Sequence, residues 1–120
     1  MRQRVKPNGT KHDLFLDFPS SKTYLAQLLG VSRSTVYLWE NLAFWRITSF
    51  RDSYPKLEDG SFDRQAPLSP YQCWVLCRVG RLMSQVVTAA RVKQGIAKNQ
   101  NYCSLYTYRT ALRNLNKITA

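Results

Sequence analysis

The spacing of Ala26, Gly30 and Val36 constrains the fold of this chain more than any other feature. Two helices can cross closely through a short turn only where one residue is small, and a glycine can adopt the positive φ that ends the first helix. An aliphatic residue six places after the glycine then fills the space between the helices. A small residue, a glycine four places later and an aliphatic residue six beyond that form the spacing of a helix-turn-helix. We therefore expect helices over about 22–29 and 33–43.

The second of these helices separates its apolar and polar side chains. At about 100° per residue, one side collects the apolar residues, which are Val36, Trp39, Leu42 and Ala43. The opposite arc holds Arg33, Ser34, Tyr37 and Asn41, with Thr35 at its edge. Arginine suits guanine, asparagine suits adenine, and serine can bond either base. Glu40 lies beside the arc, where we expect it to orient Arg33 or Tyr37 or to select against some sequences.

The charge of the chain favours a polyanionic partner. Eighteen Lys and Arg against seven Asp and Glu leave a net charge of +11. Every acid lies at or before Asp63, so residues 65–120 contain lysines and arginines with no acid among them. A helical surface that meets only water normally mixes both signs of charge. Excess charge that only aids solubility is the alternative interpretation.

Neither a membrane span nor a disulfide framework is expected. No apolar run approaches the roughly 20 residues of a membrane helix, and no secretory signal is recognisable. The three cysteines, Cys73, Cys77 and Cys103, include no C-x-x-C, and the only histidine is His12. We therefore expect a soluble, cytoplasmic protein, associated with the nucleoid if it binds DNA, with no metal and no cofactor.

The remaining sequence divides into three parts. Residues 1–21 resemble a basic arm, which either enters a minor groove or is a disordered tail. Residues 22–68 contain the helix-turn-helix and, from Arg46 onward, strand-prone residues around Pro55 and Asp59-Gly60, which predict a small two-stranded β wing or an extended loop. Residues 69–120 form a helical region in what we expect to be one compact domain overall.

The helical region begins with a clear start signal. Ser69 occupies the N-cap, Pro70 the first helical position, and Gln72 the reciprocal capping site. This helix is expected to reach about Gly95, and Gly80 inside it allows a bend or a split. A last helix over about 102–118 has a seam of regularly spaced apolar residues, which are Leu105, Tyr108, Leu112 and Leu115.

A family resemblance adds to these observations. The stretch KTYLAQLLGVSRSTVYLWENLAF, followed by a basic aromatic region and a capped helix, resembles the DNA-binding domain of MerR-type winged helix-turn-helix regulators. It is also similar to the related excisionase-like proteins. The resemblance covers roughly residues 22–83. The chain departs from that family because about 20 residues precede the motif, Tyr37 replaces the usual arginine, and neither a coiled coil nor an effector domain follows. A compact regulator of this kind is similar to the small MerR-type repressors of cyanobacterial type V-K CRISPR-associated transposons.

The resemblance implies a set of DNA contacts. It brings Arg33, Ser34, Thr35 and Tyr37 to the major groove, where Asn41 extends the same face. It brings Lys22 and Thr23 to phosphates at the start of the first helix, and Arg46, Arg51 and Lys56 to the flanking backbone. The seam at 105–115 either pairs two copies or docks within the chain. We expect a homodimer, because regulators of this size usually pair two half-sites.

These features together predict a mainly α, winged helix-turn-helix protein that binds double-stranded DNA in a sequence-specific manner. We expect a dimeric repressor that occupies a promoter and needs no small-molecule effector. Two alternatives remain: an excisionase-like accessory that bends DNA for a mobile element, and a basic adaptor that binds an acidic protein or RNA through Arg109 and Arg113. We expect no enzymatic activity, because no phosphate loop, nucleophile elbow or metal-ligand cluster is present in the sequence.

Overall fold

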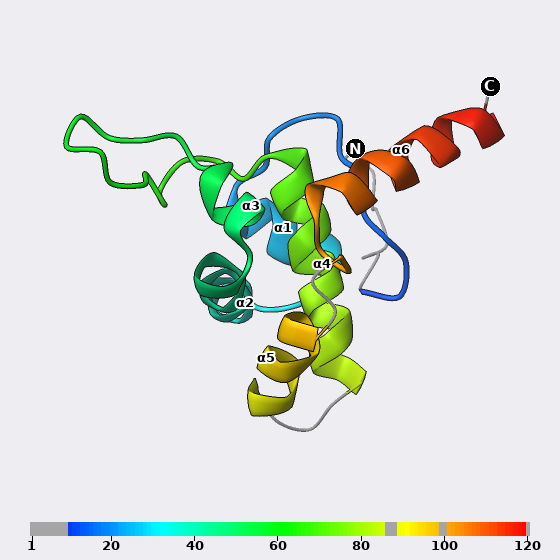
Figure 1. Ribbon diagram of the computed structural model, residues 1–120, viewed down its shortest axis with the longest axis horizontal. Coiled ribbons are helices and arrows are strands. Elements are labelled where there is room, and N and C mark those ends of the chain that lie inside the picture. Colours follow the sequence, from blue (N-terminus) through cyan, green and yellow to red (C-terminus); the bar gives the residue numbers. More distant parts are fainter. Residues whose placement is uncertain (1–9, 86–88, 99–100, 120) are drawn as a thin grey trace, which may run out of the picture.

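The protein is mainly helical. The computed structural model describes residues 10–85, 89–98 and 101–119. The helices in this part are α1 (Lys22–Leu29), α2 (Arg33–Arg46), α3 (Thr48–Asp52), α4 (Pro70–Gln85), α5 (Ala89–Lys98) and α6 (Leu105–Thr119) (Figure 1). The described residues contain isolated β-bridges but no regular strand. No helix in the described ranges is long and apolar enough to cross a membrane.

The predicted helix-turn is confirmed at its caps. Ser21 Oγ accepts a hydrogen bond from the Tyr24 amide at 3.1 Å, which begins α1. Gly30 ends α1 with φ 70°, a left-handed conformation that a residue without a Cβ adopts at little cost. Ser32 Oγ accepts from the Thr35 amide at 3.2 Å and begins α2. α2 extends to Arg46, beyond its expected end, because its apolar side continues through the buried Phe44.

The hydrophobic core is centred on α4, which lies in the middle of the molecule in Figure 1. Residues of α4 from Cys73 to Cys77 are fully buried, as is Val79. The predicted apolar side of α2 packs into the same cluster, and so do residues of all the other described helices. The position of α2 is therefore set by packing against α4, and α1 packs in turn on α2.

The start of α4 is also confirmed, and α4 is not split at Gly80. Gln72 N–H donates to Ser69 Oγ at 3.1 Å, and Ser69 N–H donates to Gln72 Oε1 at 2.9 Å, which completes a capping box. α4 continues through Gly80 to Gln85, and α5 begins at Ala89. Gly80 instead allows the Trp39 ring to lie directly against the α4 backbone, since a Cβ there would lie 2.6 Å from that ring.

The described residues do not form the expected β wing, and the segment expected to begin it is helical. Residues 48–52 form α3, and this helical turn buries the Phe50 side chain fully in the core. The segment from 53 to 69 is an extended loop that projects from the body (Figure 1), with an isolated bridge between Lys56 and Phe62 and another that joins Leu68 to Ser20. Aromatic packing holds this loop, because Phe62 lies edge-on to Phe44 with ring centroids 5.8 Å apart. The alternative of an extended loop therefore describes this region.

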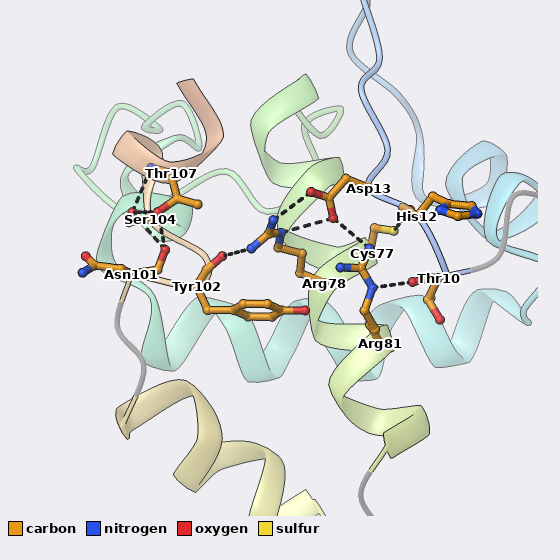
Figure 2. Close-up of polar contacts among 10 residues, drawn as sticks. All are labelled: Thr10, His12, Asp13, Cys77, Arg78, Arg81, Asn101, Tyr102, Ser104 and Thr107. Atoms are coloured by element: carbon orange, nitrogen blue, oxygen red, sulfur yellow. Dashed lines mark hydrogen bonds and ion pairs between the residues drawn. The ribbon is translucent and has the colours of Figure 1, made fainter. Parts of the chain in front are cut away.

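The described part of the N-terminal arm is docked on α4. Asp13 accepts hydrogen bonds from Arg78 at 2.8 Å and from Arg81 at 2.7 Å (Figure 2). Burial alone would raise the pKa of Asp13, but the hydrogen bonds from the two guanidiniums outweigh it and lower that pKa below its usual value. Two cations of the acid-free C-terminal half are thus neutralised by an acid from the N-terminal segment. Lys11 is exposed, whereas Arg2, Arg4 and Lys6 lie outside the described residues.

The seam of α6 docks within the chain at its first turns. Ser104 Oγ accepts from the Thr107 amide at 3.1 Å and begins α6. Tyr108 is buried, with its ring centroid 5.3 Å from that of Trp74. Leu105 and Leu112 are half-buried against the core, whereas Leu115 is 37% exposed. Tyr108 therefore has its partners inside the chain, as in the intramolecular alternative.

Gly80→Ala tests the approach of α2 to α4. The new Cβ would lie 2.6 Å from Trp39 and 2.7 Å from the Thr10 side chain, so we expect the free energy of unfolding to fall by about 1–3 kcal/mol. Gly95→Ala on α5 is the matched control, because a Cβ there meets nothing within 4 Å. It should raise stability by about 1 kcal/mol through helix propensity. Chemical denaturation measures both, and equal stability of the two variants would contradict the packing.

Candidate functional site

The outer face of α2 presents the polar residues that the sequence placed there. Arg33, Ser34, Tyr37 and Asn41 are all exposed, and Thr35 is partly exposed at the edge. Arg33 donates a hydrogen bond to Tyr37 Oη at 3.1 Å, and its guanidinium carbon lies 5.4 Å from the tyrosine ring centroid. Tyr37 therefore positions Arg33 on the surface, and the predicted face is confirmed as an exposed surface.

Glu40 is not on this face, and its predicted role of orienting Arg33 or Tyr37 is wrong. Its side chain is buried, with a residue exposure of 3%. Arg64 donates to both carboxylate oxygens, at 2.6 and 2.9 Å, and Tyr54 Oη donates to Oε2 at 2.8 Å. A buried carboxylate requires such partners because its desolvation is costly. The exposed residues of α2 consequently include no acid.

The two side chains that donate to Glu40, those of Tyr54 and Arg64, both have raised pKa values. Burial and the hydrogen bond to Glu40 raise the pKa of Tyr54, so this phenol stays a neutral donor. The hydrogen bond to Glu40 likewise raises the pKa of Arg64. The Arg64 guanidinium also lies over the Phe44 ring, with its carbon 4.0 Å from the centroid. Arg64 thus attaches the loop between α3 and α4 to α2 by an ion pair and by a cation–π contact.

The same loop residue contacts α1. Lys22 Nζ donates to the Arg64 carbonyl oxygen at 2.7 Å and lies 5.2 Å from the Tyr37 ring centroid. Lys22 is 9% exposed, so its side chain lies beneath the exposed surface and projects little into solvent. Thr23, its neighbour, is exposed at the start of α1.

A shallow hollow of about 160 Å³ lies where these elements meet. Its described lining comes from the starts of α1 and α2 and from the loop before α4, namely Ser21, Lys22, Thr23, Arg33, Tyr37, Gln65, Ala66 and Pro67. The bridge between Ser20 and Leu68 closes the base of this region, with amide-to-carbonyl distances of 2.7 and 2.8 Å. Lys22, Thr23, Arg33 and Tyr37 are therefore brought together, as the predicted set of contacts requires.

The remaining predicted contacts are more dispersed. Arg46 is exposed at the end of α2, whereas Arg51 is half-buried and its guanidinium lies 3.5 Å from the Phe44 carbonyl oxygen. Lys56 is exposed on the projecting loop, 5.5 Å from the Phe62 ring centroid. Asn41 is exposed, and its Oδ1 accepts from Trp45 Nε1 at 3.2 Å and from Arg64 Nη2 at 3.4 Å, so its carbonyl oxygen is engaged.

Sequence reasoning missed two residues of this surface. Arg64 is 24 positions from Glu40 in the chain, and no local spacing signals a pair at that separation. Trp45 is 61% exposed at the end of α2, next to Asn41. Its position on the helix wheel, one turn beyond Asn41, is the signal that could have placed it on the polar face. Trp39 and Trp74, by contrast, are buried in the core.

The described residues contain no cluster of three or more His, Cys, Asp or Glu suited to a metal ion. The three cysteines are buried and form no disulfide with one another, and burial raises the pKa of Cys73 and of Cys103 to about 12. These thiols are therefore protonated near neutral pH and behave as small core residues.

Comparison of the chain with protein-family models, with curated proteins and with solved structures gives no match. A function is therefore inferred from α2 and the residues around it.

Arg64→Ala tests whether the buried pair holds this surface together. The substitution leaves the Glu40 carboxylate buried without its cation, so we expect the free energy of unfolding to fall by on the order of 3 kcal/mol. Adding Glu40→Gln removes the uncompensated charge and should restore part of that loss. Arg46→Ala, at an exposed arginine, should change stability by less than about 0.5 kcal/mol. Denaturation curves in which Arg64→Ala matches Arg46→Ala would contradict this role.

Proposed function

We propose that this protein is a sequence-specific regulator that binds double-stranded DNA through α2 and represses transcription by occupying a promoter. One observation carries the proposal: the exposed face of α2 combines Arg33, Ser34, Tyr37 and Asn41 with no acid, because Glu40 is buried against Arg64. A helix whose outer face lacks acids and carries base-compatible groups suits the width of a major groove. The resemblance to MerR-type regulators supports the same orientation.

Recognition in this proposal divides among the exposed side chains of α2. Arg33 donates to the O6 and N7 acceptors of a guanine, while Tyr37 restricts its rotamers through their hydrogen bond. Ser34 contacts a neighbouring base, and Thr35 approaches from the edge of the face. Asn41 donates from its amide nitrogen to N7 of an adenine, since Trp45 and Arg64 already engage its carbonyl oxygen.

Phosphate contacts supply most of the affinity. Thr23 and the start of α1 meet the backbone on one side, with Lys22 behind them. Arg46, Arg51 and Lys56 meet it on the other side, where Lys56 belongs to the base of the projecting loop, at its bridge with Phe62, and not to its tip. The net charge of +11 attracts DNA over a longer range. Two copies bound side by side match two half-sites, and no effector is required.

DNA binding is tested by fluorescence anisotropy with two duplexes, the fragment upstream of the protein's own gene and a scrambled version of it. We expect about a hundredfold preference for the upstream fragment, and we expect that preference to persist as salt rises. Equal affinities that fall together with salt would contradict sequence-specific regulation. A circular-permutation mobility assay on the same fragment would show a strong bend if the protein is an excisionase-like accessory.

Arg33→Ala separates base contacts from phosphate contacts. We expect it to weaken binding to the preferred site by about 1–3 kcal/mol and to relax the preference at one base pair. Lys56→Ala should weaken binding to all sequences similarly and reduce the salt dependence. Competition with duplexes substituted one base pair at a time measures both effects. An equal loss on every sequence for Arg33→Ala would contradict its assigned role.

A further inference from the structure

The projecting loop contains carboxylates that have no role in a contact with DNA. Between Pro55 and Asp63 the chain has three of its seven carboxylates, Glu58, Asp59 and Asp63, and one cation, Lys56. Glu58 and Asp59 are exposed at the tip. Carboxylates repel phosphates, so this tip is poorly suited to lie on a DNA backbone. It is better suited to a basic protein surface.

The tip of the loop is held in one shape. Asp59 Oδ1 accepts from the Ser61 amide at 2.9 Å and from Ser61 Oγ at 2.6 Å, and these bonds lower the pKa of Asp59 below its usual value. Gly60 makes the turn with φ 89°, and the Leu57 amide donates to the Ser61 carbonyl oxygen at 2.7 Å. Leu57 itself is 50% exposed. The loop therefore presents an apolar side chain beside the carboxylates of Glu58 and Asp59.

A surface of opposite character lies on α6. A hollow of about 530 Å³ has Tyr106, Arg109, Leu112 and Arg113 as its described lining. Tyr106 is 73% exposed, and α6 contains no acid. Neither Arg109 nor Arg113 forms an ion pair with any residue that the structure describes. This surface therefore offers an apolar contact flanked by two cations without acidic partners.

The two surfaces lie at opposite ends of the molecule, with the loop projecting on one side and α6 on the other (Figure 1). They cannot meet within one copy. We propose that the acidic loop of one copy docks on the α6 hollow of a second copy, head to tail. Leu57 packs between Tyr106 and Leu112, while Glu58 and Asp59 approach Arg109 and Arg113. The like charge of two α6 helices opposes direct pairing of those helices with each other.

A head-to-tail contact leaves one loop and one α6 unused in each pair. Such heterologous interfaces extend into open chains or close into rings, unlike a two-fold dimer. If the protein binds DNA as proposed above, the contact would join copies on neighbouring sites and make their binding cooperative. The association itself does not depend on DNA binding, so it is tested without DNA.

Sedimentation velocity of the full chain, over a range of concentrations and salt, is the first measurement. We expect a sedimentation coefficient that rises with concentration past the dimer, and we expect about 0.5 M salt to reduce the association by screening the carboxylate–guanidinium pairs. A chain that stays monomeric at every concentration would overturn the proposal. So would a dimer that neither grows further nor responds to salt.

Charge reversal identifies the two surfaces. Glu58→Arg and Arg109→Glu should each raise the dissociation constant by at least about tenfold, because each places like charges together. An equimolar mixture of the two variants should associate again, since the loop of each then faces an α6 of opposite charge. Asp52→Arg and Lys11→Glu make the same changes of charge at exposed positions outside both surfaces, and should leave association unchanged.

Two results of the mixing experiment would overturn the proposal. If Glu58→Arg has no effect while Arg109→Glu abolishes association, α6 pairs with a surface other than the loop. If the mixture stays dissociated although both variants are folded by circular dichroism, the two residues do not face each other. Loss of DNA specificity in Arg33→Ala with unchanged association would show that the two proposals are independent.

Discussion

Glu40 places a carboxylate inside the protein, and the candidate interface depends on the cation that Arg64 brings to it. The ion pair at 2.6 Å attaches the projecting loop to α2. The Arg64 carbonyl oxygen accepts a hydrogen bond from Lys22 of α1, and Tyr54, in the segment after α3, donates to the Glu40 carboxylate. Three segments are therefore fixed relative to one another by one buried acid. Removing its partner would leave a charge in a poorly solvated place, which is why both ends of the pair are needed.

The same pairing shapes the surface charge of the protein. Glu40 and Asp13 are the acids whose partners are arginines in the described residues, and they neutralise Arg64, Arg78 and Arg81. Glu58 and Asp59 on the projecting loop remain exposed, and so do the arginines of α2 and α6. Charge is thus sorted into an acid-free face on α2, a basic α6 and an acidic loop tip. Each of these surfaces suits a different partner, which is the basis of both proposals.

Much of the local structure could be predicted from the residues alone. Gly30 ends α1 and Ser32 caps α2, as expected, because both effects depend on residues within one turn. The capping box of Ser69 and Gln72 is equally local. The exposed arc of α2 followed from helix geometry, since residues one turn apart share a face. The DNA contacts assigned to that arc stay predictions.

Sequence by itself determined the helix boundaries near strong caps, the apolar side of α2 and the excess of positive charge. Only the tertiary structure decided which polar groups are buried and which helix faces are covered. Glu40 lies beside the polar arc on a helical wheel, yet its side chain is buried, where it pairs with Arg64, a loop residue 24 positions away in the sequence. Phe50 has a high strand propensity, yet it lies in the short helix α3 and is buried in the core. Tyr108 belongs to the apolar seam of α6, and its ring packs against Trp74 of α4. Propensity and periodicity act over a few residues, whereas burial depends on segments that become neighbours only when the chain folds.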